Sequence, residues 1–138
     1  MKILLRTNLL LSFLIIMLFI FSLSVYANIE LSENVLDFGM LKRPKTKSIS
    51  VSVTNNSSSP FMGSVLLEKE WLTVETKDVS LAAGKSLDLS FTINSSLLEP
   101  GDYETRVIFN DLLGGAKAEL SVRCVVVEVL LPHSQYPV

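Results

Sequence analysis

Histidine is the most frequent general base in enzymes, and histidine and cysteine are the main ligands of zinc; this chain of 138 residues has one of each. His133 lies among the last residues, directly after Pro132, and Cys124 lies in a stretch of alternating apolar residues. A catalytic triad needs a histidine held in fixed geometry, and a zinc site needs several histidine or cysteine ligands. The sequence therefore predicts a protein that is not an enzyme.

Two pairs of carboxylates have a spacing that could hold a calcium ion or carry out acid–base catalysis. Glu68 and Glu70, and likewise Asp102 and Glu104, are two residues apart, which places each pair on one face of a β-strand. Solvated charges on a strand face are far more common than such sites. The sequence also lacks a glycine-rich phosphate loop and a calcium-loop motif. We expect no catalytic residue, no metal and no cofactor.

Basic and aromatic residues are the remaining candidates for binding. Lys42, Arg43 and Lys45 form a short basic loop, which is either solvated or in contact with an acidic partner surface or an anionic glycan. Trp71 and Tyr103 are candidates for stacking on a sugar, although a large aromatic side chain more often fills the core. Both alternatives stay open at this point.

The net charge argues against nucleic acid as a partner. The chain has 12 basic and 14 acidic side chains, and two of the basic ones, Lys2 and Arg6, belong to the N-terminal segment. The chain beyond that segment is therefore acidic, whereas nucleic-acid-binding domains carry basic patches.

Residues 1–27 have the order of a secretory signal peptide. A basic start is followed by an apolar run from Leu9 to Leu23, and Val25 and Ala27 stand at the positions that signal peptidase reads. The sequence predicts a signal helix removed after Ala27. The run is also nearly long enough to span a bilayer, so an uncleaved anchor helix, the only membrane contact then expected, is the alternative. In both cases the rest of the chain is exported: periplasmic, secreted or on the cell surface.

After residue 27 the apolar residues recur with a period of two, which is typical of half-buried antiparallel strands. Residues 48–54, 86–94 and 118–124 alternate strictly between apolar and polar side chains, and turn residues such as Pro100-Gly101 separate the stretches. About seven strands are expected: 29–38, 46–54, 61–68, 71–76, 86–94, 102–110 and 116–130. Short strands at this spacing predict an all-β fold, a single two-sheet antiparallel sandwich.

The alternation also predicts which side chains form the core. Cys124 should be buried and reduced, and five further side chains should point inward: Val51, Leu89, Phe91, Val107 and Leu120. The last strand contains an unbroken apolar run from Val125 to Val127, protected only by Glu128. We expect this strand to be covered by the domain's own second sheet or by another chain, and Val125 and Val127 are candidate contacts with a partner through strand pairing.

Several motifs occur in an order that resembles bacterial exported immunoglobulin-like domains of the BACON and ASH type, over about residues 29–128. They are Leu36-Asp37-Phe38-Gly39, Asn55-Asn56, Trp71-Leu72-Thr73-Val74 and Leu98-Glu99-Pro100-Gly101-Asp102-Tyr103. The spacing from Glu99 to Tyr103 resembles the tyrosine corner of immunoglobulin-like sandwiches, in which the hydroxyl bonds to the upstream backbone. The opening strands are also similar to the first domain of periplasmic pilus chaperones.

The resemblance implies an immunoglobulin-like sandwich over residues 28–131, followed by a flexible tail at 132–138. It also implies a non-enzymatic role in protein–protein contact, through an edge strand or self-association, or as a structural or adhesive surface component. The alternative function is a carbohydrate-binding module of the cell envelope, which would use Trp71 and Tyr103.

Overall fold

The computed structural model describes residues 28–113 and 117–129. The predicted signal or anchor helix at 1–27 and the predicted tail at 132–138 lie outside these residues. The described chain forms nine strands and one 3₁₀ turn, η1 (Ser95–Leu97). The strands are β1 (Ile29–Leu31), β2 (Val35–Lys42), β3 (Thr46–Asn55), β4 (Phe61–Leu67), β5 (Leu72–Val74), β6 (Asp78–Leu81), β7 (Ser86–Asn94), β8 (Gly101–Asp111) and β9 (Lys117–Val127). Within the described residues, no helix is long and apolar enough to cross a membrane.

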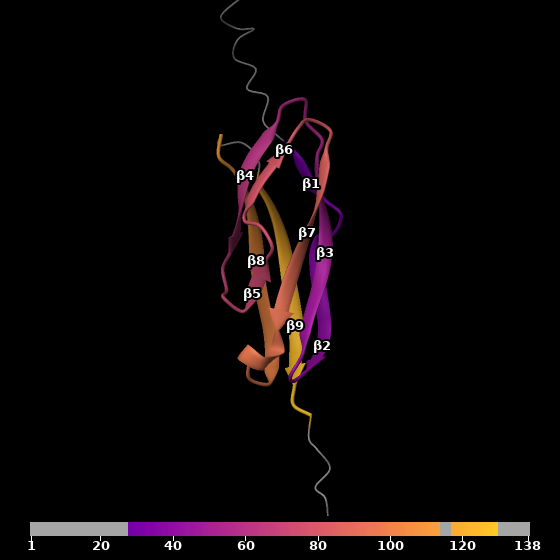
Figure 1. Cartoon of the computed structure of the whole chain (residues 1–138), viewed down its shortest axis with the longest axis vertical. Coiled ribbons are helices and arrows are strands. Elements are labelled where there is room, and N and C mark those ends of the chain that lie inside the picture. The colour runs from indigo at the N-terminus through magenta and orange to yellow at the C-terminus, as the bar shows by residue number, and fades with distance from the viewer. Residues whose placement is uncertain (1–27, 114–116, 130–138) are drawn as a thin grey trace, which may run out of the picture.

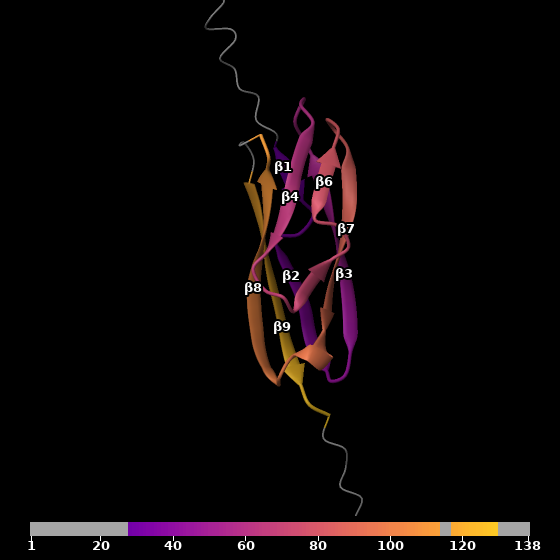
Figure 2. The same cartoon turned by 60° about the vertical axis from the view of Figure 1, so that its left-hand side comes forward.

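The strands form two sheets that face each other along an elongated sandwich (Figures 1 and 2). The four-stranded sheet has the order β1-β3-β7-β5, and the five-stranded sheet has the order β2-β9-β8-β4-β6. The all-β, two-sheet prediction is confirmed. The expectation of a purely antiparallel arrangement is wrong at one pair, because β2 runs parallel to β9.

The structure has nine strands instead of about seven because one predicted segment is divided between the two sheets and one further strand, β6, was not predicted. The predicted strand 29–38 is divided at residues 32–34: β1 pairs with β3, and β2 pairs with β9 in the other sheet. The segment predicted at 71–76 contains only β5, which pairs with β7. The chain then crosses to the five-stranded sheet as β6, which pairs with β4. β6 has only four residues, too few for alternation to identify it from sequence.

The core lies between the two sheets and agrees with the alternation of the sequence. All five side chains predicted to point inward are fully buried, and Cys124 is buried and not in a disulfide. Phe38, Phe61, Phe91 and Phe109 are the largest fully buried side chains, and they come from strands of both sheets. Aromatic rings of this size account for much of the apolar area that a small sandwich can bury.

A β-bulge in β2 changes which residues of that strand face the core. Leu36 and Phe38 point inward, the pairing with β9 shifts between Asp37 and Met40, and Leu41 is the next buried residue. Gly39 takes a positive φ of 66° at the bulge, a backbone conformation that residues with a Cβ rarely adopt. The bulge therefore turns Met40 toward solvent at a position that plain alternation would have buried.

The outer faces of the two sheets differ in chemistry. Every outward position of β3 and β7 carries Ser, Thr, Asp or Asn, and pairs such as Ser48–Thr92 (2.7 Å) and Thr54–Ser86 (2.8 Å) are hydrogen-bonded through their hydroxyls. The outer face of the five-stranded sheet instead carries five large exposed apolar side chains, namely Val35, Met40, Met62, Leu66 and Val125. Only one of the two sheets therefore has an outer face with apolar surface that a partner could shield from water.

The last strand is not an edge strand. β9 lies between β2 and β8, and its residues from Ser121 to Val127 are paired within the five-stranded sheet. The two edges of β9 are covered by β2 and β8 of the same sheet, and not by the second sheet or another chain as expected. The prediction that Val125 and Val127 contact a partner by strand pairing is therefore corrected, because their backbone groups are already used within the sheet.

Candidate functional site

The outer face of the five-stranded sheet contains a hollow of about 580 Å³ over β2, β9 and β8, which we call the outer-sheet groove. It is lined by Asp37, Gly39, Met40, Asp102, Tyr103, Glu104, Arg123, Cys124 and Val125. Val125 comes from the set predicted to contact a protein, and Tyr103 from the set predicted to contact a glycan. The sequence prediction did not include Met40 and Arg123, which together with Val125 and Asp37 form the outward surface of the groove.

The bulge at Gly39 shapes the groove. Asp37 accepts a hydrogen bond from the Gly39 N–H through Oδ1 (2.8 Å), and its Oδ2 accepts from Nε of Arg123 (3.0 Å). The Nη2 atom of Arg123 also lies 2.9 Å from the same oxygen. Met40 is 66% exposed next to Val125, with which it is paired in register. The groove therefore combines an apolar pair with an adjacent fixed ion pair.

The groove is acidic. Three carboxylates (Asp37, Asp102 and Glu104) and one guanidinium (Arg123) line it. The hydrogen bond from the Gly39 N–H is the main reason that the pKa of Asp37 is lowered, and the hydrogen bond from Arg123 adds to this effect. Asp37 is therefore ionised at neutral pH, and its negative charge balances the positive charge of Arg123. Among the described side chains, Asp102 and Glu104 make no ion pair.

Cys124 belongs to the core side of the groove wall and is not a candidate nucleophile. Only 3% of the residue is exposed. Burial, and to a smaller extent the negative charge of Asp37, raises the pKa of the thiol. The thiolate, which is the reactive form of cysteine, is therefore disfavoured at neutral pH.

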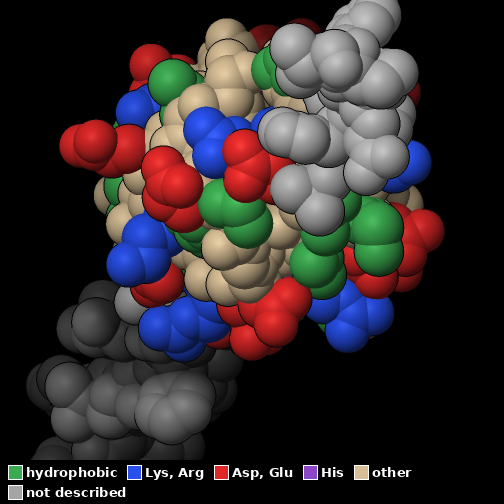
Figure 3. Space-filling view, turned by 90° about the horizontal axis from the view of Figure 1, so that it is seen from below, with side chains coloured by type: hydrophobic (Ala, Val, Ile, Leu, Met, Phe, Trp, Pro, Cys, Tyr) green, Lys and Arg blue, Asp and Glu red, His purple; other side chains and the backbone are tan. Residues whose placement is uncertain are grey.

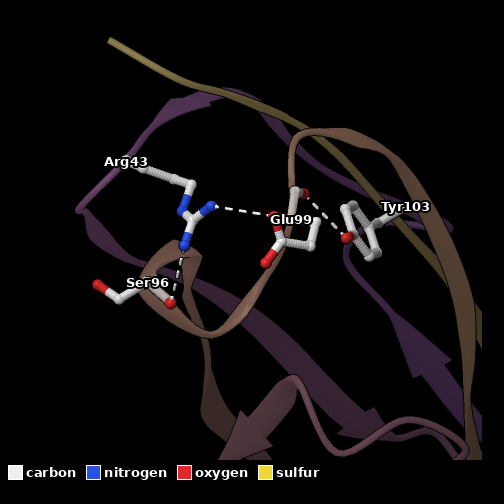
Figure 4. A network of polar contacts seen from close by, with 4 residues as sticks. All are labelled: Arg43, Ser96, Glu99 and Tyr103. Carbon is white, nitrogen blue, oxygen red and sulfur yellow. Dashed lines mark hydrogen bonds and ion pairs between the residues drawn. The ribbon is translucent and has the colours of Figure 1, made fainter.

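The basic loop below the groove is held in place by Ser95 of η1. The buried Ser95 hydroxyl accepts from the Lys45 N–H (2.8 Å) and donates to the Lys45 carbonyl (2.9 Å). Arg43 turns toward the same segment, 3.5 Å from both the Glu99 carboxylate and the Ser96 carbonyl oxygen (Figure 4). The loop is therefore ordered, and the charge of Arg43 is partly balanced by Glu99.

The other candidate contact residues lie around this loop. Lys42 is exposed and paired in register with Val127, and the Val127 carbonyl accepts from the Arg43 N–H (2.9 Å). Lys45 is exposed, whereas Val127 is half-buried. The structure therefore gathers Val125, Val127, Lys42 and Arg43 at the lower end of β2 and β9. Seen from below, this end carries charged side chains of both signs (Figure 3).

The two candidate glycan-binding residues are also brought together. The rings of Trp71 and Tyr103 meet edge to face, with centroids 5.7 Å apart, and both are partly buried against the core. The Tyr103 hydroxyl donates to the Glu99 carbonyl (2.9 Å), which confirms the predicted tyrosine corner. Both residues therefore have a packing role at the side of the sandwich.

Comparison with known proteins supports the fold and identifies a family. The ASH/PapD-like domain 7 of human CEP192 has a TM-score of 0.64 at 11% identity, over 76% of this chain and 89% of that one. A protein of the chaperone–tip adhesion subunit complex of Acinetobacter baumannii Csu pili has a TM-score of 0.59 at 12% identity, over 79% of this chain and 64% of that one. A family 123 glycoside hydrolase of Clostridium perfringens has a TM-score of 0.60 at 8% identity, over 77% of this chain and 28% of that one.

These similarities show a shared immunoglobulin-like, PapD-like fold. The chain spans less than two thirds of the length of the pilus protein and under a third of the hydrolase. No curated protein sequence matches this chain. The family model of the viral BACON domain matches residues 28–124, which is most of the chain and nearly all of the sandwich. The chain therefore belongs to the viral BACON domain family.

Proposed function

We propose that this protein is an exported contact module, which binds a protein partner through the outer-sheet groove without catalysing a reaction. The observation that carries the proposal is the difference between the two outer faces. The four-stranded sheet exposes hydroxyl groups, whereas the five-stranded sheet exposes apolar side chains and a shaped hollow. Exposed apolar patches with polar rims are typical of protein interaction sites.

The charges of the groove define the partner segment. Asp102 and Glu104 face the groove without an ion pair among the described residues, next to the apolar pair of Met40 and Val125. A segment with an apolar side chain beside a Lys or Arg would complement this surface. Lys42, at the end of β2, and Lys45, in the loop that follows, lie outside the lining of the groove and would add contacts with acidic groups of the same partner.

Similar folds agree with a role in contact. The Acinetobacter protein was determined as a complex of a chaperone with an adhesion subunit. The likeness to the glycoside hydrolase covers 28% of that enzyme and concerns the fold alone, so it gives no catalytic residues to this chain. Export, to the periplasm, the cell surface or the medium, is inferred from the sequence of residues 1–27.

A matched pair of variants tests the groove. Val125→Lys places a long cation between Met40 and Arg123, whereas Ser50→Lys places the same side chain at an exposed position of the four-stranded sheet. A photoreactive residue at position 40 of the otherwise natural chain should yield a cross-linked partner in the envelope fraction. Val125→Lys should reduce that cross-link about tenfold or more, because it removes apolar contact and adds like charge to a basic partner.

The control separates binding from folding. Ser50→Lys should leave the cross-link unchanged, and both variants should unfold at the temperature of the natural protein. If the two variants reduce the cross-link equally, the groove is not the contact site. Glycan binding that survives Val125→Lys but is lost on Trp71→Ala would favour the carbohydrate-binding alternative.

A further inference from the structure

Two leucines are exposed at the turn between β8 and β9, where polar residues are usual. Leu113 is 77% exposed and Leu112 is 72% exposed, and neither contributes to the core. Met62 of the neighbouring strand β4 is 50% exposed. We call Met62, Leu112 and Leu113 the leucine tip.

The backbone holds the leucine tip in place. The Leu112 N–H donates to the Met62 carbonyl (2.9 Å), and the Leu113 N–H donates to Oδ1 of Asp111 (3.0 Å). Both bonds fix the start of the turn relative to β4 and β8. An ordered backbone therefore holds the two side chains in solvent. Exposure of apolar side chains to water is unfavourable, and no contact within the sandwich offsets it.

The two ends of the sandwich differ in charge. The upper end in Figure 1 consists of the leucine tip, residues 56–60 and residues 82–85, and Lys85 is the only charged residue in these two loops. The lower end carries the basic loop at 42–45 together with Glu99 and Asp102, and its charged surface is visible in Figure 3. The loops of the upper end therefore carry few charges, although Asp111 lies directly beside the leucines and Glu30 and Glu119 lie near Asn28.

The N-terminal segment joins the upper end. Strand β1 begins at the top of the sandwich in both Figure 1 and Figure 2, at the same end as the turn between β8 and β9. Asn28 and Ala118 line the same surface hollow, which places the start of the domain next to the start of β9. The residues before Asn28 include the apolar run from Leu9 to Leu23. An anchor formed by that run would hold the upper end, and not the lower end, at the bilayer.

We propose that residues 1–27 are retained as an anchor and that the leucine tip inserts into the surface of the same membrane. Two leucines and a methionine can enter the boundary between headgroups and acyl chains, where apolar side chains are stabilised. Residues 56–60 carry no charge and can approach the headgroups, whereas Lys85 and the Asp111 carboxylate must stay hydrated at headgroup level. This second attachment would hold the domain upright, with the charged end and the outer-sheet groove directed away from the membrane.

A lipid surface explains these observations better than a second protein does. A protein site at the tip would need a partner that also avoids the anchor joined to Asn28, whereas a membrane contains the anchor. The tip also lies at the end of the long axis, where a flat surface can reach both leucines at once.

Lipid contact can be measured on the full chain, residues 1–138, in nanodiscs of phosphatidylcholine and phosphatidylglycerol. A polarity-sensitive fluorophore is attached to L113C or to L97C, and the natural Cys124 is too buried to react under native conditions. Leu97 is the matched control because it is 73% exposed at the lower end. A lipid with a nitroxide on its acyl chain should quench the label of L113C several-fold and leave the label of L97C nearly unchanged.

A second label separates insertion of the leucines from simple tethering by the anchor. A fluorophore on M62C should also be quenched, and replacing both Leu112 and Leu113 with Ser should remove most of that quenching. Equal quenching at positions 113 and 97 would overturn the proposal, as would quenching at 62 that ignores the leucine replacements. Protection of L113C only after addition of an envelope protein fraction would assign the tip to a protein and equally overturn the proposal.

Discussion

Asn55 shows how one side chain organises the upper end of the sandwich. It is fully buried, and its Nδ2 donates to the carbonyls of Ser59 (2.8 Å) and Leu81 (3.1 Å). Its Oδ1 accepts from the Ser57 N–H (3.1 Å) and the Ser57 hydroxyl (2.7 Å). Asn55 therefore ties residues 55–60 to the turn between β6 and β7, which explains the Asn55-Asn56 motif in structural terms.

Replacing Asn55 with Ala should lower the free energy of unfolding by about 2–3 kcal/mol, since the buried carbonyls and the Ser57 groups lose their partners. Urea unfolding followed by the fluorescence of Trp71 measures this change. Asn56→Ala is the control, because Asn56 is exposed. Equal effects of the two substitutions would contradict the assigned role of Asn55.

Thr105 represents the opposite case, a buried hydroxyl without a partner among the described residues. Only 5% of the residue is exposed, and its Oγ1 makes no hydrogen bond there. Thr105→Val should raise the free energy of unfolding by about 1 kcal/mol, because it removes the cost of the unpaired hydroxyl while keeping the shape. Thermal unfolding of the two proteins tests this, and a lower melting temperature for the Val variant would show that the hydroxyl is in fact bound.

At the scale of elements, the close contacts between strands are set by small residues and by pairs of charges. Gly63 of β4 has no room for a side chain: a Cβ there would lie 2.3 Å from the Asn110 carbonyl oxygen and 2.3 Å from the Phe61 ring. β2 is attached to β9 by the pair of Asp37 and Arg123 in addition to its backbone bonds. Lys47 of β3 donates to the Phe38 carbonyl of β2 (2.7 Å), which satisfies one backbone group of this edge strand.

Gly63→Ala should destabilise the domain by about 1–3 kcal/mol, because the backbone of β8 or the buried Phe61 must move. Chemical denaturation gives the value. Ser64→Ala, at the next position on the outer face of the sheet, should have a small effect. A Gly63→Ala variant as stable as the natural protein would mean that β4 and β8 separate more easily than the packing indicates.

The hydrogen bonds that Asp37 accepts, from the Gly39 N–H first and from Arg123 second, should make stability depend on pH in acid. Because the pKa of Asp37 is lowered on folding from its ordinary 3.8, its contribution is present above that value and is lost as the pH falls through the folded pKa. Asp37→Asn should be less stable than the natural protein at neutral pH, and the difference should shrink in acid. Asp88→Asn on the opposite outer face is the control, and a difference that does not depend on pH would contradict this prediction.

At the scale of the whole molecule, the sandwich has one polar outer face, one partly apolar outer face and two ends with different loops. The proposed contact module and the proposed membrane-facing end use different parts of this surface. The groove lies over the lower half of β2 and β9, whereas the leucine tip lies at the top of β8. A membrane-held domain would therefore leave its groove accessible to a partner.

The mass of the intact protein tests this orientation in the cell. If the anchor is retained, the protein extracted from the membrane fraction should have the mass of residues 1–138. Cleavage after Ala27 would give a protein that begins at Asn28 and would contradict retention of the anchor. Export to the envelope would stay supported in that case, because a signal peptide is removed only during export.

The sequence alone determined the fold class, the inward faces of the main strands and the tyrosine corner. Alternation with a period of two fixes which side chains share a face. The core was therefore correctly predicted to include Val51, Leu89, Phe91, Val107 and Leu120. Local spacing also sufficed for Tyr103, because its partner Glu99 is only four residues away.

Only the tertiary structure decided the strand order, the sheet changes and the composition of the groove. Alternation is the same in edge and central strands, so it could not show that β2 covers β9 and removes the expected edge. It also could not place Met40, because the bulge at Gly39 reverses the face of the residues after it. The groove combines β2 with β8 and β9, which are far apart in the sequence, and such pairing depends on packing that no local pattern records.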